Sequence, residues 1–263
     1  MKLPVLDQQP LLTVNKVNKL YGINRGCQSI GFDLYPGEVL GIVGESGSGK
    51  STLLKCLSGE CPPDVGDILF NALDGESFNL YEVGEAQRRL LMRSEFGIVK
   101  QNPRDGLRLS VSAGANIGER LMAVGDRHYG DIRSTAASWL EQVEIDEERI
   151  DDFPHSFSGG MQQRLQIARV LVTQPRLVLM DEPTGGLDVS VQARLLDMIR
   201  SLVANLNLSV VIVTHDLAVA RLLCHRLMVM QKSRVIESGL TDQILDDPQH
   251  PYTQLLVSSV LTP

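Results

Sequence analysis

The sequence predicts an α/β fold built around a parallel sheet, on three observations. Short apolar runs alternate along the chain with stretches of helical periodicity, which is typical of α/β proteins. The runs 177–180 and 210–213 are apolar throughout, as expected for parallel strands that are buried on both faces. A third apolar run, 39–43, is followed by glycines and then by the helical pattern of residues 50–57, an order that indicates a strand, a loop and a helix.

The remaining elements follow from local patterns along the chain. Up to about residue 70, short strands separated by turn signals predict a small antiparallel sheet. From 103 to 152 the strand signals fade, and helical patterns at 117–124 and 135–143 predict an inserted helical lobe. The stretch 188–206 predicts an amphipathic helix between two parallel strands, as in a βαβ unit. The apolar residues that give this stretch its helical spacing are Val189, Ala193, Leu196, Ile199, Leu202, Val203 and Leu206.

Composition limits the class of protein. Hydrophobic residues make up 43% of the chain and charged residues 22%, which is ordinary for a soluble globular protein. The net charge of −7 argues against a nucleic-acid partner, because a phosphate backbone attracts basic surfaces. No charge-free apolar run reaches the ~18 residues that span a bilayer. Residues 1–10 lack the features of a secretory signal, and the cysteines form no C-x-x-C pair. We therefore expect a cytoplasmic protein with reduced thiols and no membrane span.

The strongest functional signal is a glycine-rich segment that follows the run 39–43. It fits the pattern G-x-x-x-x-G-K-[ST] with Gly44, Glu45, Ser46, Gly47, Ser48, Gly49, Lys50 and Ser51, and Thr52 comes next. Glycines let the backbone curl so that successive N–H groups face a chain of phosphates, and the positive end of the following helix adds to the attraction. The pattern predicts ATP binding, with Lys50 at the β and γ phosphates and the Ser51 hydroxyl on Mg²⁺.

Two carboxylates end the apolar run 177–180. Asp181 and Glu182 follow it directly, which places them at the carboxyl edge of a parallel sheet, where ligands bind in such folds. Beside a phosphate-binding loop, Asp181 is expected to hold the magnesium shell and Glu182 to polarise the attacking water.

A third segment combines a helix cap with two glycines. Ser158 is suited to cap the following helix, and Gly159 and Gly160 expose backbone N–H groups at its start. These features fit an anion site and a plain capped helix equally well.

In combination, these segments resemble the motifs of the ABC ATPases. Ser158, Gly159 and Gly160 resemble the family's Leu-Ser-Gly-Gly-Gln signature, with Phe157 in place of the Leu and Met161 in place of the Gln. The glutamine contact at position 161 is therefore in question. Four further residues match the family by their place in the chain: Tyr21 with the aromatic ring that stacks on adenine, Gln101 with the lid glutamine, Asp188 with the D-loop, and His215 with the switch histidine.

The resemblance implies one ABC nucleotide-binding domain over residues 1–263. A RecA-like P-loop core with an antiparallel β subdomain would cover about 8–102 and 153–240. A helical subdomain would cover about 103–152, and a C-terminal tail about 241–263.

The resemblance also implies a catalytic arrangement. Glu182, His215 and Gln101 are expected to be catalytic, and Ser51, Gln101 and Asp181 to hold Mg²⁺. ATP would lie between the P-loop of one subunit and the signature of another, in a head-to-tail dimer. The second subunit would be another copy of the chain or a paralogue.

We expect the helical lobe to determine which partner the ATPase binds. Residues 101–114 and 128–133, with the Phe-Ser-Gly-Gly-Met signature, resemble the ATPase K subunits of phosphonate carbon–phosphorus lyase systems. That resemblance implies docking on the soluble lyase core. The tail at 248–256 instead resembles the ATPases of oligopeptide and nickel importers, which dock on membrane permeases. A DNA-repair or translation ABC ATPase is a weaker alternative, because the chain is acidic and has no coiled-coil insertion or second cassette.

The helical lobe also carries several arginines. They either pair with neighbours on their own surface or face an acidic partner. These residues are Arg104, Arg108, Arg120, Arg127 and Arg133.

Overall fold

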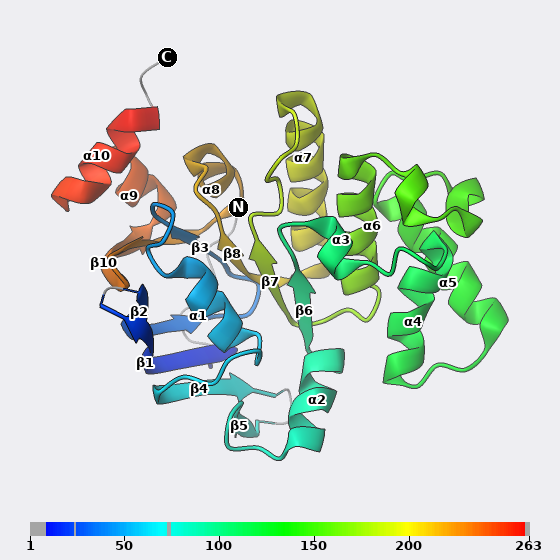
Figure 1. Ribbon diagram of the computed structural model, residues 1–263, viewed down its shortest axis with the longest axis horizontal. Helices are drawn as coiled ribbons and strands as arrows, with labels where there is room; N and C mark the ends of the chain where they lie inside the picture. Colours follow the sequence, from blue (N-terminus) through cyan, green and yellow to red (C-terminus); the bar gives the residue numbers. More distant parts are fainter. Residues whose placement is uncertain (1–8, 24, 73–74, 261–263) are drawn as a thin grey trace.

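The computed structural model describes residues 9–23, 25–72 and 75–260 and contains two sheets flanked by helices (Figure 1). The smaller sheet has the strand order β2-β1-β4-β5, and its strands pair antiparallel. These strands are β1 (Leu12–Gly22), β2 (Arg25–Leu34), β4 (Val65–Asn71) and β5 (Ser77–Asn79). The antiparallel sheet expected before residue 70 is thus present, and β5 extends it beyond that point.

The larger sheet has the strand order β10-β9-β3-β8-β7-β6. Its strands are β3 (Val39–Val43), β6 (Phe96–Val99), β7 (Leu177–Asp181), β8 (Ser209–Val213), β9 (Arg226–Gln231) and β10 (Arg234–Leu240). Strands β9, β3, β8, β7 and β6 run parallel, and β10 pairs antiparallel with β9 at one edge. Strands β3 and β8 are buried along their whole length, which explains their unbroken apolar sequences. The predicted α/β fold with a parallel sheet is confirmed.

Helices cover both faces of the larger sheet and form a lobe at one side of it (Figure 1). The core helices are α1 (Lys50–Leu57), α2 (Glu85–Ser94), α6 (Gly159–Leu171), α7 (Val189–Leu206) and α8 (Leu217–Leu223). The stretch between β6 and α6 contains α3 (Pro103–Gly106), α4 (Ala113–Val124), α5 (Tyr129–Gln142) and the 3₁₀ turns η1 (Glu147–Asp151) and η2 (Pro154–Ser156). This stretch forms the lobe and contains no strand among its residues, all of which the structure describes.

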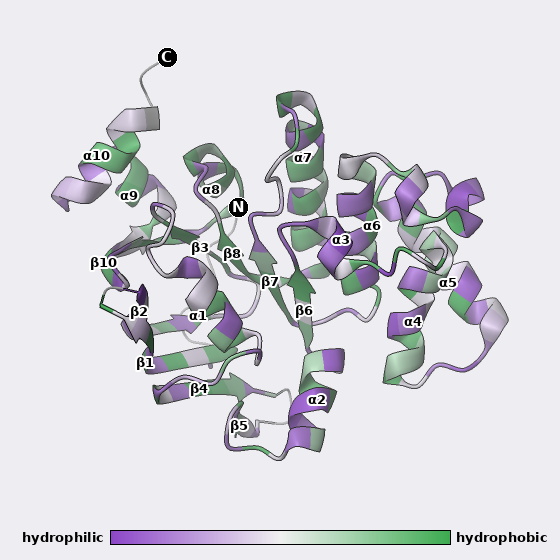
Figure 2. Ribbon diagram, in the orientation of Figure 1, coloured by the Kyte–Doolittle hydropathy of each residue, from purple (hydrophilic) through white to green (hydrophobic). Residues whose placement is uncertain are grey.

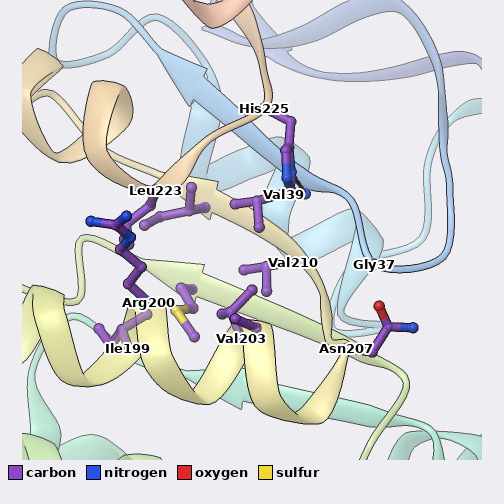
Figure 3. A pocket seen from close by; sticks show the side chains of 12 residues that line it. Gly37, Val39, Ile199, Arg200, Val203, Asn207, Val210, Leu223 and His225 are labelled. Carbon is purple, nitrogen blue, oxygen red and sulfur yellow. Dashed lines mark hydrogen bonds between the residues drawn. The ribbon is translucent and has the colours of Figure 1, made fainter. Parts of the chain in front are cut away.

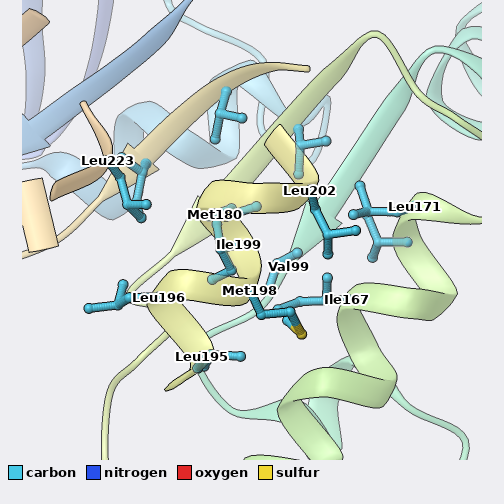
Figure 4. Close-up of a cluster of buried hydrophobic side chains, with 14 of the residues drawn as sticks. Val99, Ile167, Leu171, Met180, Leu195, Leu196, Met198, Ile199, Leu202 and Leu223 are labelled. Carbon is cyan, nitrogen blue, oxygen red and sulfur yellow. The ribbon is translucent and has the colours of Figure 1, made fainter. Parts of the chain in front are cut away.

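Helix α7 buries a different face from the one expected at its start. Its buried residues are Leu195, Leu196, Met198, Ile199 and Leu202. Figure 4 shows Met198 and Leu202 on the side of the helix that faces α6, and Leu196 on the other side. Val189, by contrast, is 84% exposed, and Ala193 is exposed as well. The prediction was wrong for these two residues because they precede Leu195, where the buried face of the helix begins.

Two buried clusters hold the layers together. One lies between the larger sheet, α7 and the helical lobe, and the other lies between the larger sheet, α1 and the antiparallel sheet. Figure 2 shows the strands of the larger sheet as predominantly hydrophobic. The larger sheet therefore lies between the two clusters, and loops leave from the carboxyl edge of its parallel strands.

The tail folds back as two helices, α9 (Thr241–Asp246) and α10 (Pro251–Val260). Thr253 and Val257 of α10 are buried, so this segment packs on the core. Across the described residues, no helix combines the length and apolar character needed to cross a membrane.

Candidate nucleotide-binding site

A cleft of about 760 Å³ lies at the carboxyl edge of the larger sheet. It is lined by Tyr21, Arg25, Gly26, Ser46, Gly47, Gly49, Lys50, Ser51, Thr52, Gln101, Glu182 and His215. These residues come from the antiparallel sheet, the loop into α1, and the segments that follow β6, β7 and β8. Elements that are far apart in the sequence therefore meet at one place, the edge at which parallel sheets bind ligands.

The glycine-rich loop connects β3 to α1 by a turn that requires glycine. Gly49 caps α1 with a φ of +107°. A Cβ atom at this position would lie 1.9 Å from the carbonyl oxygen of Gly26, so any larger residue would clash with the antiparallel sheet. The turn points the N-terminal end of α1 into the cleft, where its free N–H groups attract negative charge.

Lys50 is buried inside this loop. Its Nζ donates to the carbonyl oxygens of Gly44 at 2.7 Å and Glu45 at 2.8 Å. Burial lowers the pKa of Lys50, while the carboxylates of Glu182 and Asp181 oppose that shift. The ammonium thus stands inside the cleft, close to the two carboxylates that end β7.

The three residues expected to be catalytic meet at one carboxylate. Gln101 Nε2 donates to Glu182 Oε2 at 3.0 Å, and His215 Nδ1 lies 3.0 Å from Glu182 Oε1. Glu182 has a φ of +41°, a left-handed conformation that is rare for a residue other than glycine and common at functional sites. Its N–H donates to the carbonyl of Val213 at 2.8 Å, which fixes the side chain between the ends of β7 and β8.

Asp181 ends β7 beside this group. Burial, and then the charge of Glu182, raise the pKa of Asp181. A carboxylate in such a position gains from a nearby cation. Within the described residues, no group of three or more His, Cys, Asp or Glu side chains is arranged to hold a metal ion.

The antiparallel sheet contributes the far end of the cleft. Tyr21 is 62% exposed there, and its hydroxyl lies 3.3 Å from Cys61 Sγ. Lys19 Nζ lies 5.9 Å from the centre of the Tyr21 ring. Arg25 lines the cleft as well. Sequence reasoning missed Arg25 because no motif surrounds it, and only the pairing of β1 with β2 brings it to the site.

Several residues of the predicted site do not line the cleft. Gly44, Glu45 and Ser48 belong to the loop but do not line the cleft, and the Ser48 hydroxyl is buried without a hydrogen-bond partner among the residues that the structure describes. The others are Asp181 at the end of β7, Ser158, Gly159, Gly160 and Met161 at the start of α6, and Asp188 at the start of α7. One chain therefore does not bring its own signature segment to its own P-loop.

The signature segment is nevertheless well ordered by its own contacts. The Ser158 hydroxyl accepts from the Met161 N–H at 3.3 Å and caps α6. Arg149 lies over the Phe157 ring, 4.3 Å from its centre, and its Nη1 lies 3.6 Å from Met161 Sδ. The two residues that depart from the family's usual Leu and Gln therefore contact the same arginine of the helical lobe.

Asp188 has a comparable role at the start of α7. Its carboxylate accepts from the Val191 N–H at 3.0 Å and from the Ser190 hydroxyl at 2.8 Å. These hydrogen bonds lower the pKa of Asp188. Next to it, Gln192 Nε2 donates to Asp216 Oδ2 at 2.8 Å, which links the start of α7 to the segment that carries His215.

A second cavity, of about 440 Å³, lies between α7 and strands β3 and β8 (Figure 3). Val39, Val203 and Val210 line it, with Arg200 and His225 at its sides. It contains none of the predicted site residues and has no glycine-rich loop. The cleft at the carboxyl edge is therefore the candidate nucleotide site.

Comparison with known proteins decides the family. The sequence matches the ABC transporter family over residues 27–185. The chain belongs to the ABC transporter family. This ABC protein is 67% identical to a putative phosphonates utilization ATP-binding protein, PhnK, of Escherichia coli K12, over 96% of this chain and 98% of that protein. It is 37% identical to the dipeptide transport ATP-binding protein DppF of E. coli K12, over 96% of this chain and 77% of that protein.

Solved ABC structures resemble it throughout. The ATP-binding cassette MJ0796, a dimer in a post-hydrolysis state bound to ADP and Pi, superposes with a TM-score of 0.75 at 27% identity, covering 88% of this chain and 98% of that one. The cbiO1 protein of Clostridium perfringens gives a TM-score of 0.78 at 28% identity, covering 97% of each chain. The chain is therefore an ABC ATPase that binds and hydrolyses ATP.

Proposed function

We propose that this ABC ATPase serves the breakdown of phosphonates by docking on the soluble core of a carbon–phosphorus lyase in the cytoplasm. The observation that carries the proposal is the contrast in identity: 67% to the phosphonate-utilization protein against 33–37% to peptide-import ATPases over similar lengths of this chain. ABC ATPases share one fold but act with different partners, so the fold alone does not identify the partner. The higher sequence identity is the better guide to it.

In the proposed mechanism, the cleft holds ATP with its phosphates on the glycine-rich loop. Lys50 and the N–H groups of Ser51 and Thr52 face the phosphates, and the Tyr21 ring provides a surface for the adenine. Stacking on such a ring contributes roughly 1–3 kcal/mol.

The oxygen donors that surround the phosphate end fit Mg²⁺. The Ser51 hydroxyl, the Gln101 amide oxygen and the Asp181 carboxylate would hold it, together with phosphate oxygens, since Mg²⁺ is usually bound by few protein ligands. When bound, Mg²⁺ neutralises charge on the β and γ phosphates.

Glu182 would orient the attacking water. Gln101 and His215 each hold one of its two carboxylate oxygens, so the carboxylate is fixed in direction before the nucleotide arrives. Fixed groups aimed at a developing charge lower the barrier without having to reorganise during the reaction.

We propose that a second ATPase subunit completes each site, in a head-to-tail dimer of two copies or of this chain and a paralogue. Ser158 and Gly159 are exposed and lie outside the cleft of their own chain, so their N–H groups are free to approach the nucleotide of another subunit. The dimeric form of the MJ0796 cassette supports this arrangement.

The helical lobe, residues 103–152, is the proposed docking element. Four of its five expected arginines are engaged locally. Arg108 bonds to Glu119 and Arg133 to Asp151, whereas Arg120 and Arg127 donate to backbone carbonyls. Only Arg104 makes no side-chain hydrogen bond or ion pair with any residue that the structure describes. Reversal of Arg104 to Glu is therefore expected to weaken docking while ATP binding stays normal.

The deciding experiment is an affinity purification of tagged Glu182→Gln protein with Mg-ATP from its own cells grown on a phosphonate. The soluble and membrane fractions are analysed separately by mass spectrometry. Subunits of a soluble lyase core in the eluate would support the proposal. Recovery of a membrane permease instead would overturn it and identify an importer motor of the oligopeptide or nickel type.

A further inference from the structure

The C-terminal helices reach the nucleotide site through one tyrosine. The hydroxyl oxygen of Tyr252, in the first turn of α10, accepts a hydrogen bond from the backbone N–H of Glu45 at 3.0 Å. Glu45 is the second residue of the glycine-rich loop, and neither it nor Tyr252 lines the cleft. The loop is therefore held from outside by a segment that lies 207 residues further along the chain.

The peptide group that Tyr252 holds is the one that also holds Lys50. The N–H of Glu45 and the carbonyl of Gly44 belong to the same peptide unit, and this carbonyl accepts from Lys50 Nζ at 2.7 Å. The described chain contains no cis peptide, and the N–H and C=O of a trans peptide point in opposite directions. A single rigid plane thus joins the tyrosine on its outer side to the phosphate-binding lysine on its inner side.

Tyr252 is itself held by a network that starts at β10. The Glu237 carboxylate accepts from the N–H groups of Gln249 at 2.7 Å and His250 at 3.0 Å. His250 Nδ1 in turn accepts from the Tyr252 N–H at 3.1 Å. These bonds fix the turn before α10, so the phenol presents its oxygen to the loop in one position.

We propose that Tyr252 is a positioning residue for the glycine-rich loop and that the turn 249–252, anchored by Glu237, sets the affinity for ATP. A loop that is already in its binding conformation loses less freedom when the nucleotide arrives, and so binds more tightly. Tyr252 lies outside the cleft lining and takes no part in the chemical step. Its loss therefore acts on binding and leaves the rate at saturation unchanged.

The first test replaces Tyr252 by Phe, which keeps the ring and removes only the hydroxyl. The Kd for Mg-ATP should rise about three- to tenfold, the effect of losing one hydrogen bond, with kcat at saturating ATP within twofold of the unaltered protein. Tyr129→Phe is the matched control, because Tyr129 is 73% exposed on the helical lobe, and its Kd should not change. A Tyr252→Phe Kd within twofold of the control would overturn the proposal.

The second test removes the anchor without touching the loop. Glu237→Ala frees the turn 249–252, so it should raise the Kd for Mg-ATP by a similar factor. Combining it with Tyr252→Phe should then give no further increase, because both changes break the same connection. Fully multiplicative effects on the Kd would show that the two residues act independently, and would overturn the role assigned to Glu237 and its turn.

Discussion

Replacing Glu182 by Gln should stop hydrolysis and leave ATP bound. A glutamine side chain is neutral and has an NH2 donor in place of one of the two acceptor oxygens that contact Gln101 and His215 at 3.0 Å. The group that polarises the water therefore loses its charge and one of its two acceptor oxygens. We expect kcat to fall about 100- to 10,000-fold, which corresponds to about 2.7–5.5 kcal/mol in the barrier.

ATP affinity should remain the same or increase in this variant. The Glu182 charge lies close to Lys50 and Asp181 and affects the pKa of both, so its removal relieves repulsion toward the γ-phosphate. Phosphate release at saturating Mg-ATP measures the rate, and equilibrium binding of labelled ATP measures the affinity. Glu141→Gln, on the exposed side of α5, is the charge-matched control. A Glu182→Gln rate within threefold of this control would refute the role assigned to Glu182.

Three further variants probe the cleft. Lys50→Ala should lose most nucleotide affinity, because the change removes the ammonium expected at the phosphates. Intact binding in a filter assay would contradict the site. Gly49→Ala places a methyl group 1.9 Å from the Gly26 oxygen at a φ of +107°. It should lower the free energy of unfolding, measured in urea, by roughly 1–3 kcal/mol. The control Gly84→Ala meets no atom within 4 Å and should not lower it. Asp181→Asn should raise the thermal midpoint at pH 7, because the pKa of Asp181 is raised in the fold and its charged form therefore destabilises it. That gain should shrink as the pH falls through the raised pKa of the folded state and should vanish well below 3.8, where the carboxyl is protonated in the folded and the unfolded protein. A gain that persists there would contradict this explanation.

The centre of the larger sheet could be predicted because β3, β7 and β8 are short and almost wholly apolar. The runs at 39–43, 177–180 and 210–213 all lie within strands of the larger sheet. Strand β6, with only four residues, and helix α2, whose only buried residue is Leu91, gave too weak a pattern to be predicted. Both lie in the stretch between the antiparallel sheet and the helical lobe, where apolar residues follow neither the helical nor the strand period for long.

The candidate site, too, could be predicted only in part. Local motifs identify the glycine-rich loop and the carboxylates after β7 because their chemistry is encoded in adjacent residues. The contact between Tyr252 and Glu45 joins residues far apart in the chain, and no local pattern indicates it. Arg25 escaped prediction for the same reason. The departure at Met161 could be seen in the sequence, but its contact with Arg149 depends on how the helical lobe packs.

Gln166 links α6 to the residue that precedes Gln101 of the cleft. This side chain is fully buried, and its Oε1 accepts from the Lys100 N–H at 2.7 Å while its Nε2 donates to the Lys100 carbonyl at 3.1 Å. Gln101, the next residue, bonds to Glu182. The helix that begins with the signature is thereby fastened to the residue that reaches the catalytic carboxylate.

Gln166→Leu should therefore affect both stability and catalysis. It preserves the volume but leaves the backbone polar groups of Lys100 without these partners, at a cost of about 1–3 kcal/mol for each buried group left unsatisfied. Because Gln101 then loses its fixed position, kcat for ATP should fall beyond what the unfolded fraction explains. Gln166→Glu keeps an acceptor for the Lys100 N–H but places a carboxylate oxygen beside the Lys100 carbonyl in a buried site, so it should not restore the stability of the parent protein. A lower thermal midpoint with an unchanged kcat per folded molecule would show that Gln166 only supports the fold.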